Sequence, residues 1–275
     1  MTIQQFIKEN IIKLKGITDI PQKELYILLG FVMQKDFIWL TLNNMYILKE
    51  EYLDTLNKYV ELRANAYPIE YITGTASFYS EEFEVRDGVL IPRPETEILI
   101  DKAYEILSKI SSPKVLEIGV GSGIISTMLA KKIHDIKIIA VDINPKALEL
   151  SLQNALKHQV ADKIEFRLSD MFENVQSEYF DMLVSNPPYI ASDFVLPKNV
   201  TYEPKEALFG GIKGDEMIIS MIKECKDRNI KYFCCEMGYD QKEVFTKEFL
   251  KYECEFEFYE DYSGFDRGFT LEFKG

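Results

Sequence analysis

The chain is short of positive charge and of the cysteine patterns that build disulfide frameworks or zinc sites. Its 275 residues carry 32 lysines and arginines against 45 aspartates and glutamates, a formal net charge of -13. A field of this sign repels nucleic-acid phosphates, so a nucleic-acid partner is not expected. No CxxC pair occurs, which excludes a signal for a disulfide framework or a metal site and predicts buried free thiols. The cysteines are Cys225, Cys234, Cys235 and Cys254.

Long apolar runs are also missing. The chain begins MTIQQFIKENIIKL, without a basic start followed by an apolar block, and no later stretch holds 18 uncharged apolar residues. Hydrophobic residues nevertheless make up 47% of the chain and charged residues 28%, the mix of a globular protein with a core to bury. We therefore expect a cytoplasmic, monomeric protein with no membrane partner.

The texture of the sequence changes twice along the chain. Residues 1–70 repeat apolar side chains at helical spacing, as at Phe6 and Leu14, and predict a small helical bundle. Residues 71–95 alternate apolar and polar side chains around a tight-turn signal at Asp87 and Gly88, and predict a hairpin linker. Residues 96–275 alternate strand-like and helical patterns. The expected strands are 114–118, 136–141, 163–167, 180–184, 231–236, 253–258 and 269–273.

This order predicts an α/β fold, a Rossmann-like, mostly parallel sheet of seven strands with helices on both faces. A glycine-rich loop follows the first of these strands in VLEIGVGSGIISTMLA. Glycine allows a tight turn and close approach of the backbone to a ligand, whose polar end can then face the N-terminus of the following helix. The candidate cofactor-binding residues here are Glu117, Gly119, Val120, Gly121, Ser122 and Gly123.

Acidic residues end the next two strands. Asp142 lies 23 residues after Gly119, where a carboxylate can accept both hydroxyl groups of a ribose. Asp170 could accept from an adenine amine, with Met171 or Phe172 packing on the ring. A dinucleotide site needs its third glycine one position later, at Ile124, and an acid already precedes the loop, which favours S-adenosylmethionine over NAD. Alternatively, the glycines form only a turn and the acids only cap helices.

The fourth strand ends in VSNPPYI. In an open parallel sheet this position borders the ligand crevice. Two prolines fix the backbone and remove its N–H groups, so Pro187 and Pro188 leave carbonyl groups for a ligand. A planar NH2 group can donate to the Asn186 side-chain oxygen and the Pro187 carbonyl, while Tyr189 stacks on the flat acceptor. These residues are the candidate catalytic and substrate-binding set, Asn186 also facing the cofactor; the alternative is a strand end stiffened by proline.

The order VLEIGVGSG, VDIN, SDMF and SNPPYI resembles class I S-adenosylmethionine-dependent methyltransferases that act on planar NH2 groups. The stretches YITGTASFYSEEFEV, LIPRPETEILI, YEPKEALFGG and DYSGFDRGF resemble the HemK/PrmC family in particular. This resemblance implies methylation of the glutamine in the Gly-Gly-Gln motif of peptide chain release factors, which modulates translation termination. It also implies S-adenosylmethionine as cofactor and a helical N-terminal domain that docks the substrate protein.

The resemblance extends from about Tyr71 to the C-terminus. It places Arg93 and Glu95 on a loop beside the pocket, as substrate-binding residues. Glu117 stands where many members of the family have aspartate, and the first 66 residues match poorly.

Other interpretations remain open from the sequence. The same NPPY chemistry would serve an RNA or DNA exocyclic-amine methyltransferase, although residues 1–66 have no basic run and a single arginine, Arg63. A methyltransferase-like scaffold without turnover is a third alternative. Glu236, at the end of YFCCEMGY, could line the pocket or be a simple strand-end acid, and no residue is identified as a general base.

Overall fold

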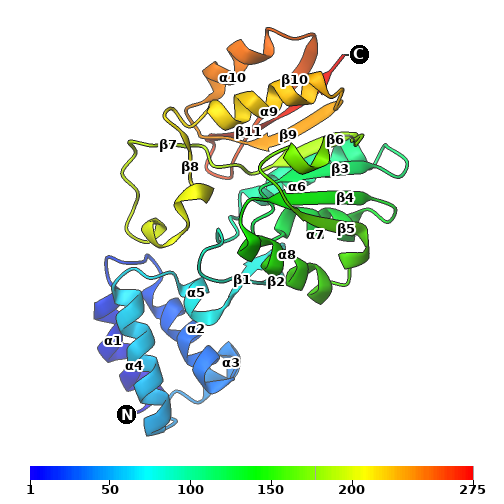
Figure 1. Ribbon diagram of the computed structural model, residues 1–275. Coiled ribbons are helices and arrows are strands. Elements are labelled where there is room, and N and C mark those ends of the chain that lie inside the picture. The colour runs from blue at the N-terminus through cyan, green and yellow to red at the C-terminus, as the bar shows by residue number, and fades with distance from the viewer. Residues whose placement is uncertain (177, 275) are drawn as a thin grey trace. The chain divides into compact units, whose positions relative to one another are not determined.

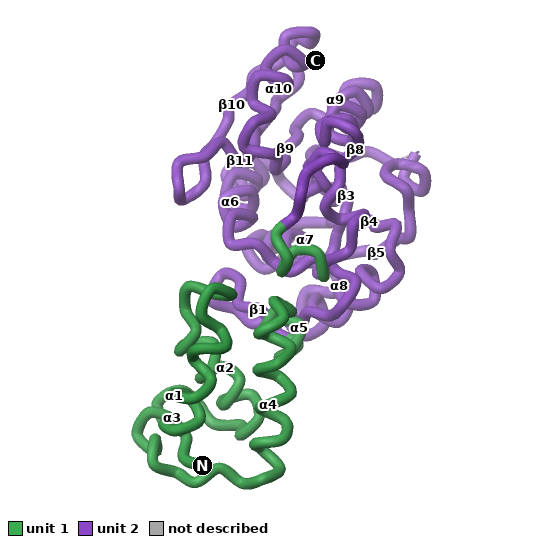
Figure 2. Tube along the Cα trace, turned by 90° about the vertical axis from the view of Figure 1, so that its left-hand side faces the viewer, with its two compact units in different colours: residues 1–74, 197–202 green, residues 75–196, 203–275 purple. Residues whose placement is uncertain are grey.

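The structure is a computed structural model that describes residues 1–176 and 178–274. They form two compact units, one of Met1–Gly74 with Pro197–Tyr202 and one of Thr75–Leu196 with Glu203–Gly275 (Figures 1 and 2). None of the helices in the described residues has the length and apolar character needed to cross a membrane.

The first unit is helical. Its helices are α1 (Ile3–Leu14), α2 (Pro21–Met33), α3 (Phe37–Leu42), α4 (Glu50–Ala64) and α5 (Ile69–Thr73). Thr2 and Gln5 form a capping box at the start of α1, and Pro21 begins α2 where its missing N–H costs nothing. A buried ion pair joins Arg63 to Glu24 at 2.7 Å across α4 and α2. The helices thus share a core whose largest side chains include Phe6, Leu14, Leu25, Leu28 and Leu29.

The segment 197–202 belongs to this helical unit although it lies far along the chain. It contains the short helix η3 (Val200–Tyr202). The Tyr202 hydroxyl donates to the Asn65 carbonyl at 3.0 Å, and its ring meets that of Tyr67 edge-on with centroids 5.1 Å apart.

A hairpin opens the second unit. Strands β1 (Thr75–Phe78) and β2 (Glu81–Glu84) pair antiparallel and bury Phe78 and Phe83. The expected turn at Asp87 and Gly88 is wrong for this hairpin. The chain instead reverses at Tyr79 and Ser80, with φ of 52° and 59°, because two left-handed residues match the twist of a two-residue hairpin. Gly88, with φ of 84°, lies in the following turn.

Seven strands form the main sheet, in the order β10-β11-β9-β6-β3-β4-β5. All run parallel except β11, which is antiparallel to both β10 and β9. The structure confirms the predicted α/β class and places every expected strand within a few residues of its position. The strands are β3 (Lys114–Ile118), β4 (Lys137–Asp142), β5 (Ile164–Leu168), β6 (Met182–Ser185), β9 (Tyr232–Glu236), β10 (Cys254–Glu260) and β11 (Asp266–Phe273).

Helices cover both faces of this sheet (Figure 1). Helices α6 (Thr96–Leu107), α7 (Ile124–Lys132) and α8 (Pro145–Lys157) pack on one face, with Val115, Ile138 and Val184. Helices α9 (Glu216–Asp227) and α10 (Lys242–Phe249) pack on the other, with Leu116, Leu183 and Phe233. Each central strand is apolar on both sides, as a doubly covered parallel sheet requires.

Three short connections complete the second unit. Turns η1 (Ala161–Lys163) and η2 (Glu173–Val175) flank β5. Between β6 and α9 the chain forms a parallel pair, β7 (Ile190–Ala191) with β8 (Phe209–Gly211), and the turn η4 (Lys205–Ala207). From β3 the strands proceed through β4 to the edge strand β5, and the chain then returns to place β6 on the other side of β3. The gap between β3 and β6 is therefore the switch point where ligands bind in such folds.

The Asn154 side chain ties α8 to two neighbouring segments. It accepts from the Glu84 N–H at 2.8 Å and donates to the Glu84 and Ser122 carbonyls at 3.0 and 2.8 Å. Asn154 is fully buried. Asn154→Ala would leave these backbone groups without partners, so we expect it to lower the free energy of unfolding by about 3 kcal/mol.

Urea unfolding followed by circular dichroism would measure this loss. Leu152→Ala, on the exposed side of the same helix, serves as the control and should change the free energy by less than about 0.5 kcal/mol. Equal losses in the two variants would contradict a role for the Asn154 hydrogen bonds.

Candidate active site

A cavity of about 140 Å³ lies at the carboxyl ends of β3, β4, β5 and β6. Its walls come from the turns that leave these strands and from the segment around η4. The lining residues include Gly119, Gly121, Asp142, Ile143, Asn144, Asp170, Met171, Asn186, Pro188, Pro204, Glu206, Ala207 and Met217. The cavity therefore occupies the switch point of the sheet.

A second, smaller cavity of about 30 Å³ shares part of this lining. Gly119, Gly121 and Asn186 line both cavities, whereas Arg93 and Thr96 line only the smaller one. Asn186 thus lies where the two spaces adjoin.

The glycine loop after β3 adopts a conformation that other residues rarely take. Gly119, Gly121 and Gly123 have φ of 75°, 54° and 80°. A Cβ on Gly123 would lie 2.8 Å from the Ser151 Cβ, so this glycine also lets α7 pack closely on α8. Val120 and Ser122 are buried and line only the smaller cavity, while Gly123 lines neither.

Asp142 connects the end of β4 to this loop. Its Oδ2 accepts from the Gly121 N–H and its Oδ1 from the Asn144 N–H, both at 2.9 Å. Burial raises the pKa of Asp142, and these backbone hydrogen bonds oppose the rise. The carboxylate is thereby fixed at the wall of the larger cavity, where it can accept hydrogen bonds from a ligand.

Glu117 lies beneath the loop and lines neither cavity. Its side chain is fully buried, and Oε2 accepts from the Ser126 N–H in the first turn of α7 at 3.1 Å. Burial raises the pKa of Glu117 to about 8. The acid before the glycine loop thus holds strand β3 to α7, and its predicted contact with a cofactor has no counterpart in the lining of the cavity.

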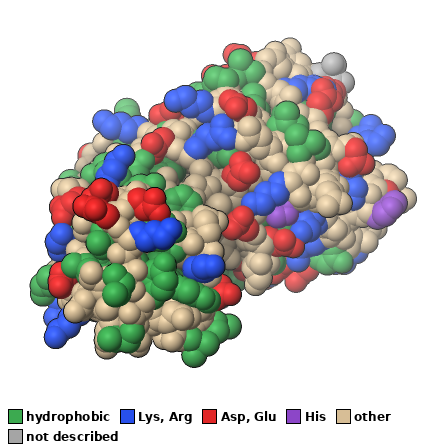
Figure 3. Space-filling model, turned by 90° about the horizontal axis from the view of Figure 1, so that it is seen from below, with side chains coloured by type: hydrophobic (Ala, Val, Ile, Leu, Met, Phe, Trp, Pro, Cys, Tyr) green, Lys and Arg blue, Asp and Glu red, His purple; other side chains and the backbone are tan. Residues whose placement is uncertain are grey.

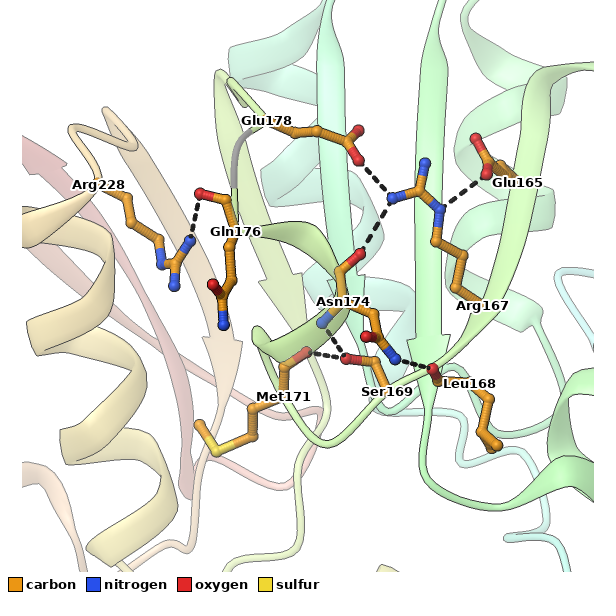
Figure 4. Close-up of polar contacts among 9 residues, drawn as sticks. All are labelled: Glu165, Arg167, Leu168, Ser169, Met171, Asn174, Gln176, Glu178 and Arg228. Atoms are coloured by element: carbon orange, nitrogen blue, oxygen red, sulfur yellow. Dashed lines mark hydrogen bonds and ion pairs between the residues drawn. The ribbon is translucent and has the colours of Figure 1, made fainter.

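Asp170 and Met171 reach the larger cavity from the end of β5. The Ser169 hydroxyl accepts from the Asn174 N–H at 3.0 Å and donates to the Met171 carbonyl at 3.1 Å (Figure 4). These contacts hold Met171 at a φ of 42° with its side chain directed away from them. Phe172, the alternative ring-packing residue, is instead buried in the core with α9.

The Asn-Pro-Pro-Tyr segment is held from several directions. The Asn186 Nδ2 donates to the Thr96 hydroxyl at 3.1 Å, at the start of α6. Pro187 is buried, and Pro188 lines the larger cavity. The Tyr189 carbonyl accepts from the Gln241 side chain at 3.0 Å, and burial raises the pKa of the Tyr189 hydroxyl.

Glu203 is a residue that the sequence reasoning missed. Its buried carboxylate accepts from the Ile91 N–H at 3.0 Å and pairs with the Arg93 guanidinium. Arg93, predicted to bind substrate, thus has a carboxylate partner within the chain and retains partial exposure. Glu95, the other predicted residue of this loop, precedes α6 and lines neither cavity. The signal for Glu203 was the quoted stretch YEPKEALFGG.

A glycine loop, an acid after the next strand and Asn-Pro-Pro-Tyr after a third, gathered at the switch point of a doubly wound sheet, define a methyltransferase. Residues 96–202 match the family model described as the methyltransferase small domain, and residues 7–74 match that of the PrmC N-terminal domain.

The chain belongs to the release factor glutamine methyltransferase family. It is 43% identical to the release factor glutamine methyltransferase of Dictyoglomus turgidum over 211 residues, which cover 74% of this chain and 73% of the relative. Against the enzyme of that name from Aquifex aeolicus the identity is 34% over 260 residues, 92% of each chain. The chain spans half the length of the bifunctional methyltransferase of Rickettsia bellii, with 34% identity.

The fold recurs in solved structures of low sequence identity. The catalytic domain of hMettl16, solved in complex with the MAT2A 3'UTR hairpin 6, superposes with a TM-score of 0.57 at 14% identity, covering 88% of this chain and 94% of that one. This likeness concerns the fold alone.

The buried carboxyl of Glu117 makes stability depend on pH. Because its pKa in the folded protein is about 8, the folded state keeps a proton that the unfolded chain loses near pH 4.5. Its contribution to stability is therefore full below pH 4.5 and falls as the pH rises to about 8. Glu117→Gln cannot ionise and keeps an acceptor for Ser126. We expect it to gain about 3 kcal/mol over the wild type between pH 5 and 8.

Urea unfolding of both proteins across this pH range would measure the difference. A constant offset between Glu117→Gln and the wild type at every pH would show that Glu117 is ionised in the folded protein and would contradict the raised pKa.

Proposed function

We propose that this protein transfers a methyl group from S-adenosylmethionine to the side-chain amide nitrogen of the glutamine in the Gly-Gly-Gln motif of peptide chain release factors. Such a modification would modulate translation termination. The observation that carries the proposal is the position of Asn186, which lines both adjoining cavities, in a chain of the release factor glutamine methyltransferase family.

The larger cavity has the residues that S-adenosylmethionine needs. Asp142 offers a fixed carboxylate to the ribose hydroxyls, and Asp170 an acceptor to the adenine amine. Met171 and Ile143 provide apolar walls for the ring, and the backbone at Gly119 and Gly121 allows close approach of the amino-acid part. When bound, the cofactor supplies an electrophilic methyl group.

Asn186 and the prolines act on the acceptor amide. Its two hydrogens need two acceptors, which the Asn186 Oδ1 and the Pro187 carbonyl provide. Both hydrogens then point into the protein, and the nitrogen lone pair points toward the cofactor side of Asn186. Tyr189 packs on the planar amide. Holding the amide in this orientation supplies much of the rate enhancement, since no general base is assigned.

Other parts of the chain would bind the substrate protein. In this proposal the helical unit docks the release factor, and its surface offers exposed apolar side chains on and after α3. They are Phe37, Ile38, Leu42, Met45 and Ile47. Arg93 and Glu95 contact the backbone of the incoming loop, with Arg93 held in place by Glu203. The enzyme acts in the cytoplasm as a monomer.

The charge of the protein favours a protein substrate over nucleic acid. Its net charge is -13, and acidic and basic side chains are interspersed over the face shown in Figure 3. A field of this sign opposes contacts with phosphates.

Mass spectrometry tests the reaction directly. A release factor incubated with the protein and S-adenosylmethionine should gain one methyl group on the glutamine of the Gly-Gly-Gln peptide. An unmodified glutamine, with cofactor binding intact by calorimetry, would overturn the proposed substrate and direct the same assay to ribosomal RNA.

Two substitutions should separate acceptor binding from cofactor binding. Asn186→Ala removes an acceptor of the substrate amide, so kcat/KM for the release factor should fall at least about 100-fold while the cofactor Kd changes less than about tenfold. Asp142→Ala should show the reverse order of effects, raising the cofactor Kd about 10- to 100-fold. Isothermal titration and initial rates measure both. Loss of cofactor binding in Asn186→Ala would contradict this division of roles.

A further inference from the structure

The orientation of the Asn186 amide is the feature on which acceptor binding depends. An asparagine side chain has nearly the same shape after a 180° flip, which exchanges its oxygen and its NH2 group. In the structure Nδ2 faces the Thr96 hydroxyl at 3.1 Å. A hydroxyl group can donate or accept, so Thr96 alone does not select this orientation. A further group must decide which way the Thr96 proton points.

Glu236 is placed to make that selection. In the register of β6 and β9, Ser185 lies opposite Cys235, so the residues that follow, Asn186 and Glu236, leave neighbouring parallel strands side by side. Glu236 is 1% exposed, and its Oε1 has no hydrogen-bond partner among the described residues. Thr96 is its hydrogen-bonding neighbour and is itself fully buried.

We propose that Thr96 and Glu236 are positioning residues that together fix the Asn186 amide with its oxygen toward the substrate. A carboxylate only accepts hydrogen bonds, so it draws the Thr96 proton toward itself. The Thr96 oxygen is then left to accept from Asn186 Nδ2. Asn186 Oδ1 consequently faces the acceptor site, where it receives a hydrogen of the glutamine NH2 group. This inference rests on the proposed function for the identity of the acceptor.

Ionisation of Glu236 would control this arrangement. Burial raises the pKa of Glu236 to about 7, while the Thr96 hydrogen bond and the nearby arginines oppose the rise. Once protonated, Glu236 can donate to Thr96, which may then turn its own proton to Asn186 and permit the flipped amide. The charged or titratable groups that face Glu236 are Arg267 on β11, Tyr259 on β10, Arg93 and Glu95 before α6, and Tyr189.

Substitution of Thr96 tests the arrangement in the full-length enzyme. Thr96→Val keeps the shape and removes the hydroxyl, so kcat should fall about 10- to 100-fold with the cofactor Kd unchanged within about threefold. Thr96→Ser restores the hydroxyl and should recover kcat to within about threefold of the wild type. Equal activity of the valine and serine variants would overturn the proposal.

Glu236→Gln provides the second test. Its side-chain NH2 can donate to Thr96, so kcat should fall about tenfold. The wild-type rate should increase through about pH 7 as Glu236 ionises, and this step should be absent in the glutamine variant. A step retained unchanged in Glu236→Gln would exclude Glu236 as its source.

Nuclear magnetic resonance of the protein without ligands gives a readout independent of turnover. In wild type the Asn186 side-chain 15N–1H2 signals should shift with pH near 7, and the shift should be lost in Thr96→Val and Glu236→Gln. Signals that do not respond to pH in the wild type would overturn the proposal. A normal titration in an enzyme that methylates no release factor would leave the arrangement standing and refute only the proposed substrate.

Discussion

The divergence of the chain beyond β3 and β6 is the constraint on which the site depends. These strands lie side by side and run parallel, yet β3 leads to α7 on one face of the sheet and β6 leads toward α9 on the other. The space between their carboxyl ends is therefore not filled by a connection. Glycines keep the first exit tight, with the Gly119 and Val120 N–H groups bonded to Val141. Prolines keep the second exit rigid, so both walls of the crevice are backbone of fixed shape.

Two buried glutamates at strand ends have different surroundings and different roles. Glu117 meets the first turn of α7, accepts from the Ser126 N–H, and has no arginine among the groups that shift its pKa. Its raised pKa makes it a neutral structural group at neutral pH. Glu236 is equally buried, but Arg267 and Arg93 lower its pKa and bring it close to neutrality. The second glutamate can therefore change its charge within the working range of an enzyme, whereas the first remains protonated.

Local sequence determined most of what could be predicted. The seven strands were identifiable because each is a short apolar run, and Asp142 and Asn186 because they directly follow such runs, where side chains reach the crevice. The partners of these residues were not identifiable. Glu203 reaches Ile91 across 112 positions, and Thr96 reaches Asn186 across 90. The hairpin turn at Tyr79 and Ser80 also escaped prediction, because neither residue type favours left-handed backbone and the register is set by burial of Phe78 and Phe83.

The proposed orientation of Asn186 also explains how the site would choose an amide. A glutamine presents an NH2 group and a carbonyl oxygen of similar size, so shape distinguishes them poorly. With Oδ1 and the Pro187 carbonyl facing the substrate, the NH2 group finds two acceptors, whereas a flipped glutamine would oppose oxygen to oxygen. With Asn186 itself flipped, its NH2 would oppose the NH2 of the substrate and leave donors unpaired. Since unpaired buried polar groups cost about 1–3 kcal/mol each, selection depends on fixing the direction of one hydroxyl proton, that of Thr96.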